Sequence, residues 1–202
     1  NLDTKTGELV LKTFEQLKEK RWKYFLSAVL LMILTFQVFP QYKPLNSRDW
    51  LFLYASKSAP IYVSKGDYQT AEKMYQQALS IQPEDTNTLY NLGSLYASEK
   101  KYDQAIAIFE NILKTQPFQV DALYNLAHCL KETGNTQRAL ALFEQVGQLQ
   151  PQSIDSQIQI LQIHLKENNC SMAQRYADKI IQIEPKLKPK IQELLQLQPC
   201  SP

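Results

Sequence analysis

Apolar residues recur at helical spacing along most of the chain, in pairs of stripes joined by short polar turns. Within residues 86–119, Leu92 and Tyr96 lie four apart, and after a turn Phe109 and Ile112 lie three apart. Residues at these spacings share one face of an α-helix. Pro117 closes the second stripe, because the residue before a proline is driven out of the α region. The pattern predicts a unit of two consecutive helices.

The same plan recurs at intervals of 34 residues without an insertion. An alanine inside the second stripe and a proline after it appear in every unit: Ala71, Ala105, Ala139 and Ala173, then Pro83, Pro117, Pro151 and Pro185. This pattern resembles the tetratricopeptide repeat, a helix–turn–helix unit of that length. The resemblance implies an all-α fold in which four helix pairs form an α-solenoid. The expected repeats are 52–85, 86–119, 120–153 and 154–187, with a capping helix and tail at 188–202.

The residue types inside the repeats have a physical explanation. Small residues let paired helices approach closely, and the bulky position that holds Phe109 fills the space between them. Gly66, Gly134 and Asn168 stand at the turns between helices, where a left-handed backbone suits Gly or Asn. No single pair can bury its apolar stripe alone, so stability is shared along the stack.

The N-terminal part of the chain does not follow this plan. Residues 24–42 carry no charge, and as a helix they rise about 27 Å, enough to cross a hydrocarbon core. Their apolar residues surround the whole helix, which favours a transmembrane helix over a buried core helix. Aromatic residues at both ends suit the two interfaces. The predicted membrane residues are Trp22, Tyr24, Phe25, Leu30, Leu31, Ile33, Leu34, Phe36, Phe39 and Tyr42.

The charged flanks of this span predict its orientation. Residues 1–23 form a polar, amphipathic segment, expected to be a solvated helix, with a membrane-surface helix as the alternative. More Lys and Arg residues precede the span than follow it at close range. The positive-inside rule then places the N-terminus on the cytoplasmic, matrix or stromal side and the repeats opposite; the reverse remains the alternative. Because the first residue is Asn, we expect a chain that was processed or that begins partway through a gene product.

The two ends of the repeat array are less regular. We expect residues 43–51 to be a short linker, with Ser47 or Asp49 capping a helix that begins near Trp50. The apolar run 50–54 is interpreted as core, with a contact to lipid or a membrane partner as the alternative. At the other end, Ile191, Leu194 and Leu195 predict one apolar stripe on the capping helix.

Composition and candidate chemistry narrow the function further. A net charge of +2 is too small to indicate nucleic-acid binding. The chain has neither a glycine-rich phosphate loop nor HExxH. His128, Cys129 and His164 are the candidates for a metal or redox site, but buried or groove-lining roles are more typical of such residues. Three cysteines form no complete disulfide framework. We therefore predict no catalytic residue, metal, cofactor or small-molecule substrate.

The resemblance also implies where a partner binds, because the first helices line a concave groove in this family. Carried over by position, the predicted groove residues are Asn87, Tyr90, Asn91, Ser94, Asp121, Tyr124, Asn125, His128, Lys131, Gln159 and Gln162. Tyrosine rings and amide groups are good contacts for a polypeptide. An alternative is that Tyr-Asn-Leu is common consensus. Relatives that clamp a C-terminal carboxylate use basic residues, whereas Ser56, Asp121 and Asn125 stand at those positions, so we reject that specialised function.

Together these features predict a non-enzymatic interaction scaffold anchored in a membrane by a single pass. We expect it to act as an assembly factor or accessory subunit of a membrane protein complex. The plan is similar to anchored tetratricopeptide proteins that assist photosystem I assembly. The alternative is a periplasmic-type chaperone for translocating or maturing clients, as in translocon-associated chaperones or cytochrome c maturation.

Overall fold

A computed structural model describes Lys23 and residues 46–197 of the chain. The predicted transmembrane helix and nearly all of the segment before it lie outside the described residues. Among the helices that are described, none is both long and apolar enough to cross a membrane. The chain divides into the units Asn1–Asn46 and Ser47–Pro202, and the helices below belong to the second.

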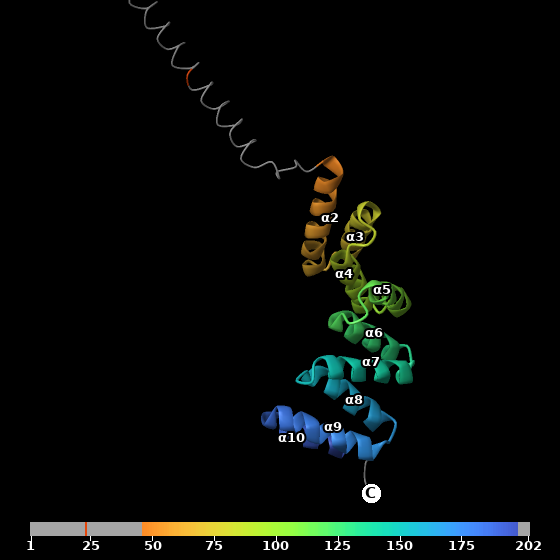
Figure 1. Ribbon diagram of the computed structural model, residues 1–202, viewed down its shortest axis with the longest axis vertical. Helices are drawn as coiled ribbons and strands as arrows, with labels where there is room; N and C mark the ends of the chain where they lie inside the picture. Colours follow the sequence, from red (N-terminus) through yellow and green to blue (C-terminus); the bar gives the residue numbers. More distant parts are fainter. Residues whose placement is uncertain (1–22, 24–45, 198–202) are drawn as a thin grey trace, which may run out of the picture. The chain divides into compact units, whose positions relative to one another are not determined.

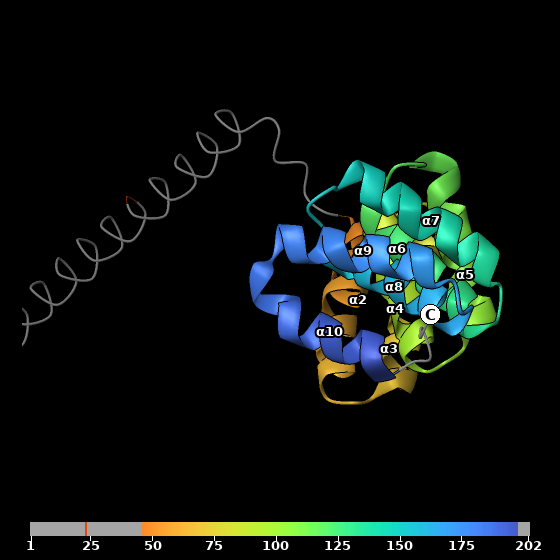
Figure 2. The ribbon, with the colours of Figure 1, turned by 90° about the horizontal axis from the view of Figure 1, so that it is seen from below.

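The described part of this unit consists of helices and turns without a strand, which confirms the predicted all-α solenoid (Figure 1). The helices are α2 (Ser47–Ser64), α3 (Tyr68–Ile81), α4 (Thr86–Ser98), α5 (Tyr102–Thr115), α6 (Val120–Glu132), α7 (Thr136–Leu149), α8 (Ile154–Lys166), α9 (Cys170–Ile183), the 3₁₀ turn η1 (Pro185–Leu187) and α10 (Lys188–Leu197). Consecutive helices pack on one another in chain order. Figure 2, which looks along the stack, shows α3, α5 and α7 at successive positions around its periphery.

The first helices begin at regular intervals except at the N-terminal end. Helices α4, α6 and α8 begin at Thr86, Val120 and Ile154, each 34 residues after the last. Helix α2 begins at Ser47, three residues before the predicted start near Trp50 and inside the predicted linker 43–51, of which residues 43–45 lie outside the described part of the chain. The segment from Ser47 onward contains no residue that stops a helix before Pro60, and Asp49 in the first turn favours the helix N-terminus electrostatically. The helix therefore starts as soon as the sequence permits.

Close packing within each pair depends on small residues. The repeating alanines of the second helices are all fully buried, and Phe109 and Phe143 are buried beside them. A Cβ at Gly93 would lie 3.0 Å from two ring carbons of Phe109, so this glycine gives the ring its space. The core of the stack is therefore formed by helix pairs whose backbones approach closely.

The turns within each pair use a left-handed residue. Gly66, Gly134 and Asn168 have φ of +77°, +86° and +56°, as their sequence positions predicted. In the second repeat the same conformation is taken by Lys100, with φ of +60°. A left-handed lysine costs about 1–2 kcal/mol relative to the right-handed form. Two backbone hydrogen bonds close this turn, from the N–H of Lys100 to the carbonyl of Ala97 and from the N–H of Lys101 to that of Tyr96.

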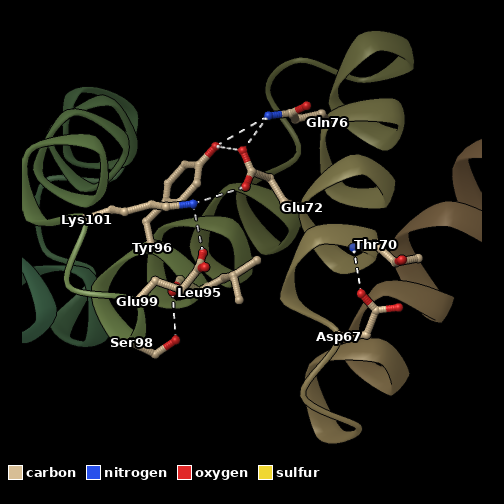
Figure 3. A network of polar contacts seen from close by, with 9 residues as sticks. All are labelled: Asp67, Thr70, Glu72, Gln76, Leu95, Tyr96, Ser98, Glu99 and Lys101. Atoms are coloured by element: carbon tan, nitrogen blue, oxygen red, sulfur yellow. Dashed lines mark hydrogen bonds and ion pairs between the residues drawn. The ribbon is translucent and has the colours of Figure 1, made fainter.

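A polar network joins the first repeat to the second (Figure 3). The Tyr96 hydroxyl of α4 donates to Glu72 Oε1 of α3 at 2.9 Å, and Gln76 Nε2 donates to the same oxygen at 3.0 Å. Lys101 Nζ lies 3.4 Å from Glu72 Oε2 and 3.2 Å from Glu99 Oε2, over the face of the Tyr96 ring. Helices α3 and α4 and the turn that follows α4 are thus joined around one carboxylate.

The two ends of the array differ. At the C-terminal end, Ile191 of α10 is buried with Leu161, Leu165 and Ala173, and Leu194 and Leu195 pack against this cluster, as predicted for a cap. At the N-terminal end, the interpretation of residues 50–54 as core is wrong, because four of the five side chains are exposed: Trp50, Leu51, Leu53 and Tyr54. In the described part of the chain, no helix pair precedes α2 to cover them.

Candidate functional site: the face formed by the first helices

The predicted groove residues all lie on first helices of the array. Asn87, Tyr90, Asn91 and Ser94 lie on α4, Asp121, Tyr124, Asn125, His128 and Lys131 on α6, and Gln159 and Gln162 on α8. Asn87, Asp121 and Gln162 are exposed, and the others are half-buried. Contacts between α4 and α6 across the intervening helix bring successive repeats together on this face. We call this set the first-helix face.

Two tyrosines on this face are held by rings of the second helices. The Tyr90 ring lies 6.1 Å from that of Phe109, and the Tyr124 ring lies 5.4 Å from that of Phe143 in an edge-on arrangement. Both phenylalanines are fully buried. Aromatic pairs in these geometries stabilise by about 0.5–1.5 kcal/mol beyond the area that they bury. The tyrosines are thus fixed at their apolar ends, while their hydroxyl groups are available for polar contacts.

Hydrogen bonds between repeats connect the polar groups of the face. Asn125 Nδ2 of α6 donates to the Tyr90 hydroxyl of α4 at 3.0 Å. Lys131 Nζ of α6 donates to Gln159 Oε1 of α8 at 2.6 Å. The face therefore spans three repeats as one connected surface.

Burial favours the neutral forms of two titratable groups of this face, Tyr124 and His128. Burial, with help from the Asp155 charge, raises the pKa of Tyr124 above its ordinary value. Burial and the nearby Lys131 charge lower the pKa of His128. Neutral His128 can donate from one ring nitrogen and accept at the other. Of the predicted groove residues, only Lys131 and Asp121 then carry charge, so hydrogen bonding rather than net charge dominates the face.

A hollow at the C-terminal end of the face includes residues that the sequence analysis missed. It has a volume of about 420 Å³, and its lining residues are Lys131, Glu132, Thr136, Gln162, Ile163, Lys166 and Leu194. Glu132 and Lys166 share one position of the repeat, next to the predicted Lys131, so the repeat pattern could have found both. Leu194 was not, because it comes from α10, whose docking direction is not encoded in the repeat.

The candidate chemistry of His128, Cys129 and His164 is not assembled into a site. Cys129 is fully buried, and burial raises the pKa of its thiol to about 11, so it is neither a thiolate nor accessible. His164 is buried, with its ring stacked 5.7 Å from that of Tyr176. Cys170 is disulfide-bonded. Within residues 46–197, no three His, Cys, Asp or Glu side chains gather as metal ligands would.

Solved structures with this architecture are numerous. MamA residues 41–end from Desulfovibrio magneticus RS-1 align with a TM-score of 0.64 at 16% identity, over 79% of this chain and 96% of that one. YrrB, described as a TPR protein with an unusual peptide-binding site, gives 0.62 at 22% identity, over 80% and 82%. A tetratricopeptide repeat protein from Parabacteroides merdae ATCC 43184 gives 0.66 at 21% identity, over 73% and 60%. Because the sequence identities are low, these similarities show that the fold is shared and nothing more.

The sequence matches no curated protein. It does match the sequence profile of the tetratricopeptide repeat, over residues 62–117 and 96–162, which together span half of the chain. The matched region includes three of the four left-handed residues, three of the four repeating alanines and the whole of the first-helix face. This chain belongs to the tetratricopeptide repeat family.

Proposed function

We propose that this protein is a non-enzymatic interaction scaffold, anchored in a membrane, that binds a polypeptide of a membrane protein complex through the first-helix face. In this role it acts as an assembly factor or accessory subunit. The observation that carries the proposal is the connected face on α4, α6 and α8, where anchored tyrosines and amides are joined across repeats.

The chemistry of the face suits a polypeptide. A tyrosine fixed at its ring offers contact area at little conformational cost, and amides of Asn and Gln can pair with both the N–H and C=O groups of a backbone. Asn87, Asn91 and Gln162 are available from the edges of the connected network. A tetratricopeptide protein of similar fold, YrrB, is described as having a peptide-binding site, which supports this class of partner.

The near absence of charge on the face limits the partner further. A nucleic acid requires several cations along its backbone, and a carboxylate clamp requires them at its centre. Lys131 is held by Gln159 and lies 3.6 Å from Glu132. The partner segment that fits best is polar and uncharged, with its backbone exposed.

The membrane anchor in this proposal comes from the uncharged residues 24–42. The bias of flanking Lys and Arg supports an N-terminus on the cytoplasmic, matrix or stromal side and repeats on the opposite side. Anchoring raises the effective concentration of the face toward partners in the same membrane. A modest affinity of the face is then sufficient for a stable complex.

The face is tested by extracting the full chain from its native membrane with mild detergent and separating complexes by blue-native electrophoresis. Arg is introduced at Asn87 and Asn125, where its bulk and charge disrupt contacts on the face. The matched control is Asn111→Arg, the same change at an exposed position of α5. We expect the control to migrate in one discrete large band with fixed partners, and Asn87→Arg/Asn125→Arg to migrate as free protein.

Three results would contradict the proposal in different ways. A large band retained by both variants excludes the first-helix face as the binding site. A native chain that migrates alone, with mixed unfolded clients recovered only by cross-linking, points to a chaperone instead. If both variants lose the band while circular dichroism shows intact helices, the partner requires α5 as well as the face.

The anchor is tested separately by alkaline carbonate extraction. The full chain is expected to remain with the membrane pellet, whereas Leu31→Arg/Leu34→Arg, which places two charges in the predicted span, is expected to be released. A charge near the bilayer centre costs about 2.5–3.5 kcal/mol per residue on insertion scales. Release of the unmodified chain by carbonate would contradict the anchor but leave the first-helix face untouched.

A further inference from the structure

Helix α2 exposes an apolar face to its surroundings. Trp50, Leu53, Tyr54 and Ile61 are 60%, 42%, 45% and 53% exposed. Leu53, Tyr54 and Ile61 follow Trp50 by three, four and eleven residues, which places all four side chains along one side of the helix. Ala55 and Ala59, which are fully buried, lie on the opposite side. A helix at the surface of a soluble array carries polar residues where α2 carries these four.

The repeat register shows why this face lacks a cover. Tyr54 stands at the position of Thr88, Ala122 and Ser156, and Ile61 stands at the position of Leu95, Cys129 and Ile163. In α4, α6 and α8 all six of these residues are buried. Each of those helices packs against the second helix of the preceding repeat. Helix α2 opens the array in the described part of the chain, so the same positions face outward.

The residues on this face do not suit another helix pair. Where the later first helices meet a preceding helix, the position of Tyr54 is taken by the small residues Thr88, Ala122 and Ser156. Tyr54 is large, and its ring stacks on that of Trp50 at 5.8 Å and 12°. The pair protrudes where close helix approach requires a small side chain. A further repeat, or a second copy docked in the same manner, would meet this ridge.

The charges around the face are complementary to anionic headgroups. Arg48, Lys57 and Lys65 are exposed along α2 and its end, and Asp49 is the one acidic residue of the helix. Exposed Trp and Tyr with nearby Lys and Arg are typical of a membrane–water interface. Each Lys or Arg near an anionic surface adds to the attraction.

We propose that this face of α2 lies in the interfacial region of the bilayer, with Trp50 and Tyr54 at headgroup level. The inference rests on the proposed anchor, because the uncharged stretch ends at residue 42 and four residues, 43–46, lie between it and α2. Four residues span at most about 14 Å when fully extended, which holds α2 near the surface. The membrane then covers the end of the array that no helix pair covers among the described residues, and fixes the direction in which the first-helix face is presented.

The test uses the two tryptophans of the chain, Trp22 and Trp50. Full-length Trp22→Phe, with Trp50 as its sole tryptophan, is reconstituted into vesicles of phosphatidylcholine and phosphatidylglycerol that contain lipids brominated at either shallow or deep acyl positions. We expect blue-shifted Trp50 emission and a loss of that emission which is larger with shallow bromines. Leu53→Glu/Ile61→Glu in this background is expected to reduce the quenching, while Gln77→Glu on exposed α3 leaves it unchanged.

The reciprocal variant Trp50→Phe separates this inference from the anchor itself, because it reports Trp22 beside the predicted span. Quenching of Trp22 without quenching of Trp50 would overturn the contact of α2 and keep the anchor. No quenching of either would overturn both. Trp50 that is shielded from aqueous acrylamide yet unaffected by bromines, in chains that cross-link as pairs, would assign the face to a second copy and overturn the lipid contact.

Discussion

Tyr96 and His164 occupy the same position of the repeat, two repeats apart, and both are buried. The Tyr96 hydroxyl has Glu72 and Gln76 as partners, at 2.9 and 3.4 Å. His164 has no hydrogen-bond partner for either ring nitrogen among the described residues. Shifting Glu72 by two repeats gives Leu140, which offers no polar atom. The fourth repeat thus keeps a polar residue after its counterpart on the preceding helix has become apolar.

The intermediate repeat clarifies the comparison. There the same two positions hold Leu130 and Ile106, an apolar pair. At these two positions, repeat 2 has a polar residue facing a polar one, and repeat 3 has an apolar residue facing an apolar one. In repeat 4 a polar residue faces an apolar one. Glu144, which stands where repeat 1 has Gln76, accepts from the Tyr176 hydroxyl at 3.4 Å instead. Burying a polar group without a partner costs about 1–3 kcal/mol, so this difference lowers the stability of repeat 4.

A second position shows the same change. Gln157 stands where the second and third repeats have Leu89 and Leu123, and Gly147 of the third repeat stands where the first and second have Leu79 and Leu113. Gln157 is fully buried, and both of its amide atoms lack partners within residues 46–197. These two residues line a cavity of about 380 Å³ between α7, α8 and α9. We infer that α8–α10 is the part of the array that unfolds first, while repeats 2 and 3 form its stable centre.

The largest expected effect is at that centre. Phe109→Ala removes a fully buried ring that packs against Gly93 and Tyr90, and should lower the free energy of unfolding by about 3–5 kcal/mol. The same position in repeat 4 is naturally Ala177. Urea unfolding of the full chain in mild detergent, followed by circular dichroism, measures the loss. Phe118→Ala, at a 69% exposed ring, is the control and should change stability by less than about 0.5 kcal/mol. If the two variants lose the same free energy of unfolding, repeat 2 is not part of the stable centre.

The next effect has the opposite sign. Gln157→Leu restores the residue found at this position in repeats 2 and 3 and removes two unpaired buried polar atoms, so it should stabilise α8 and α9 by about 1–3 kcal/mol. Hydrogen exchange of the full chain, resolved by peptide, should show slower exchange in residues 154–183. Gln182→Leu, at an exposed position of α9, should have little effect. Faster exchange in Gln157→Leu would mean that the amide is held by ordered water and belongs to the core.

The sequence predicted the regular features because they depend on one repeat alone. The buried alanines, the left-handed residues at Gly66, Gly134 and Asn168, and the ends of the second helices follow from spacing and residue type. The first-helix face likewise follows from position in the repeat. Its hydrogen bonds between Asn125 and Tyr90 and between Lys131 and Gln159 could not be predicted, because each joins side chains of different repeats.

The errors arose where a neighbour decides the outcome. Trp50 and Tyr54 have core-like composition, yet the sequence does not say that no helix pair covers α2 in the described residues. The sequence makes His164 a candidate for a metal or redox site, but its lack of hydrogen-bond partners among the described residues depends on Leu140 in the preceding helix. The repeat pattern therefore predicts on which face a residue lies, whereas the contribution of that residue to stability depends on the residue that it faces.

A smaller effect should appear at alkaline pH in the centre of the array. Burial raises the pKa of the Cys129 thiol from about 9 to about 11. The folded state then holds this proton more tightly than the unfolded state, so the stabilisation is complete below pH 9 and is lost as the pH rises from about 9 to 11. Thermal unfolding between pH 8 and 11 should show a smaller decrease in midpoint for Cys129→Ala than for the native chain. Burial also raises the pKa values of Tyr75 and Tyr96. These two tyrosines are present in the variant and in the native chain, so they lower the midpoint equally in both. Identical decreases in the thermal midpoint of the two chains would contradict the raised pKa of the Cys129 thiol.

The smallest effects test the opening comparison most directly, because the same new residue is placed at both positions. Tyr96→Phe leaves Glu72 without its hydroxyl donor and should destabilise the chain by about 1 kcal/mol. His164→Phe keeps a ring against Tyr176 while removing two unpaired nitrogens, and should stabilise by a similar amount. Urea midpoints measure both, with Tyr68→Phe at an exposed tyrosine as the control. Combining Tyr96→Phe with Glu72→Gln should cost less than the sum of the two single changes, because the first change has already removed their shared bond. If both phenylalanine variants shift stability in the same direction, burial at this position outweighs polar pairing, and the weakness of repeat 4 must come from Gln157 and its cavity.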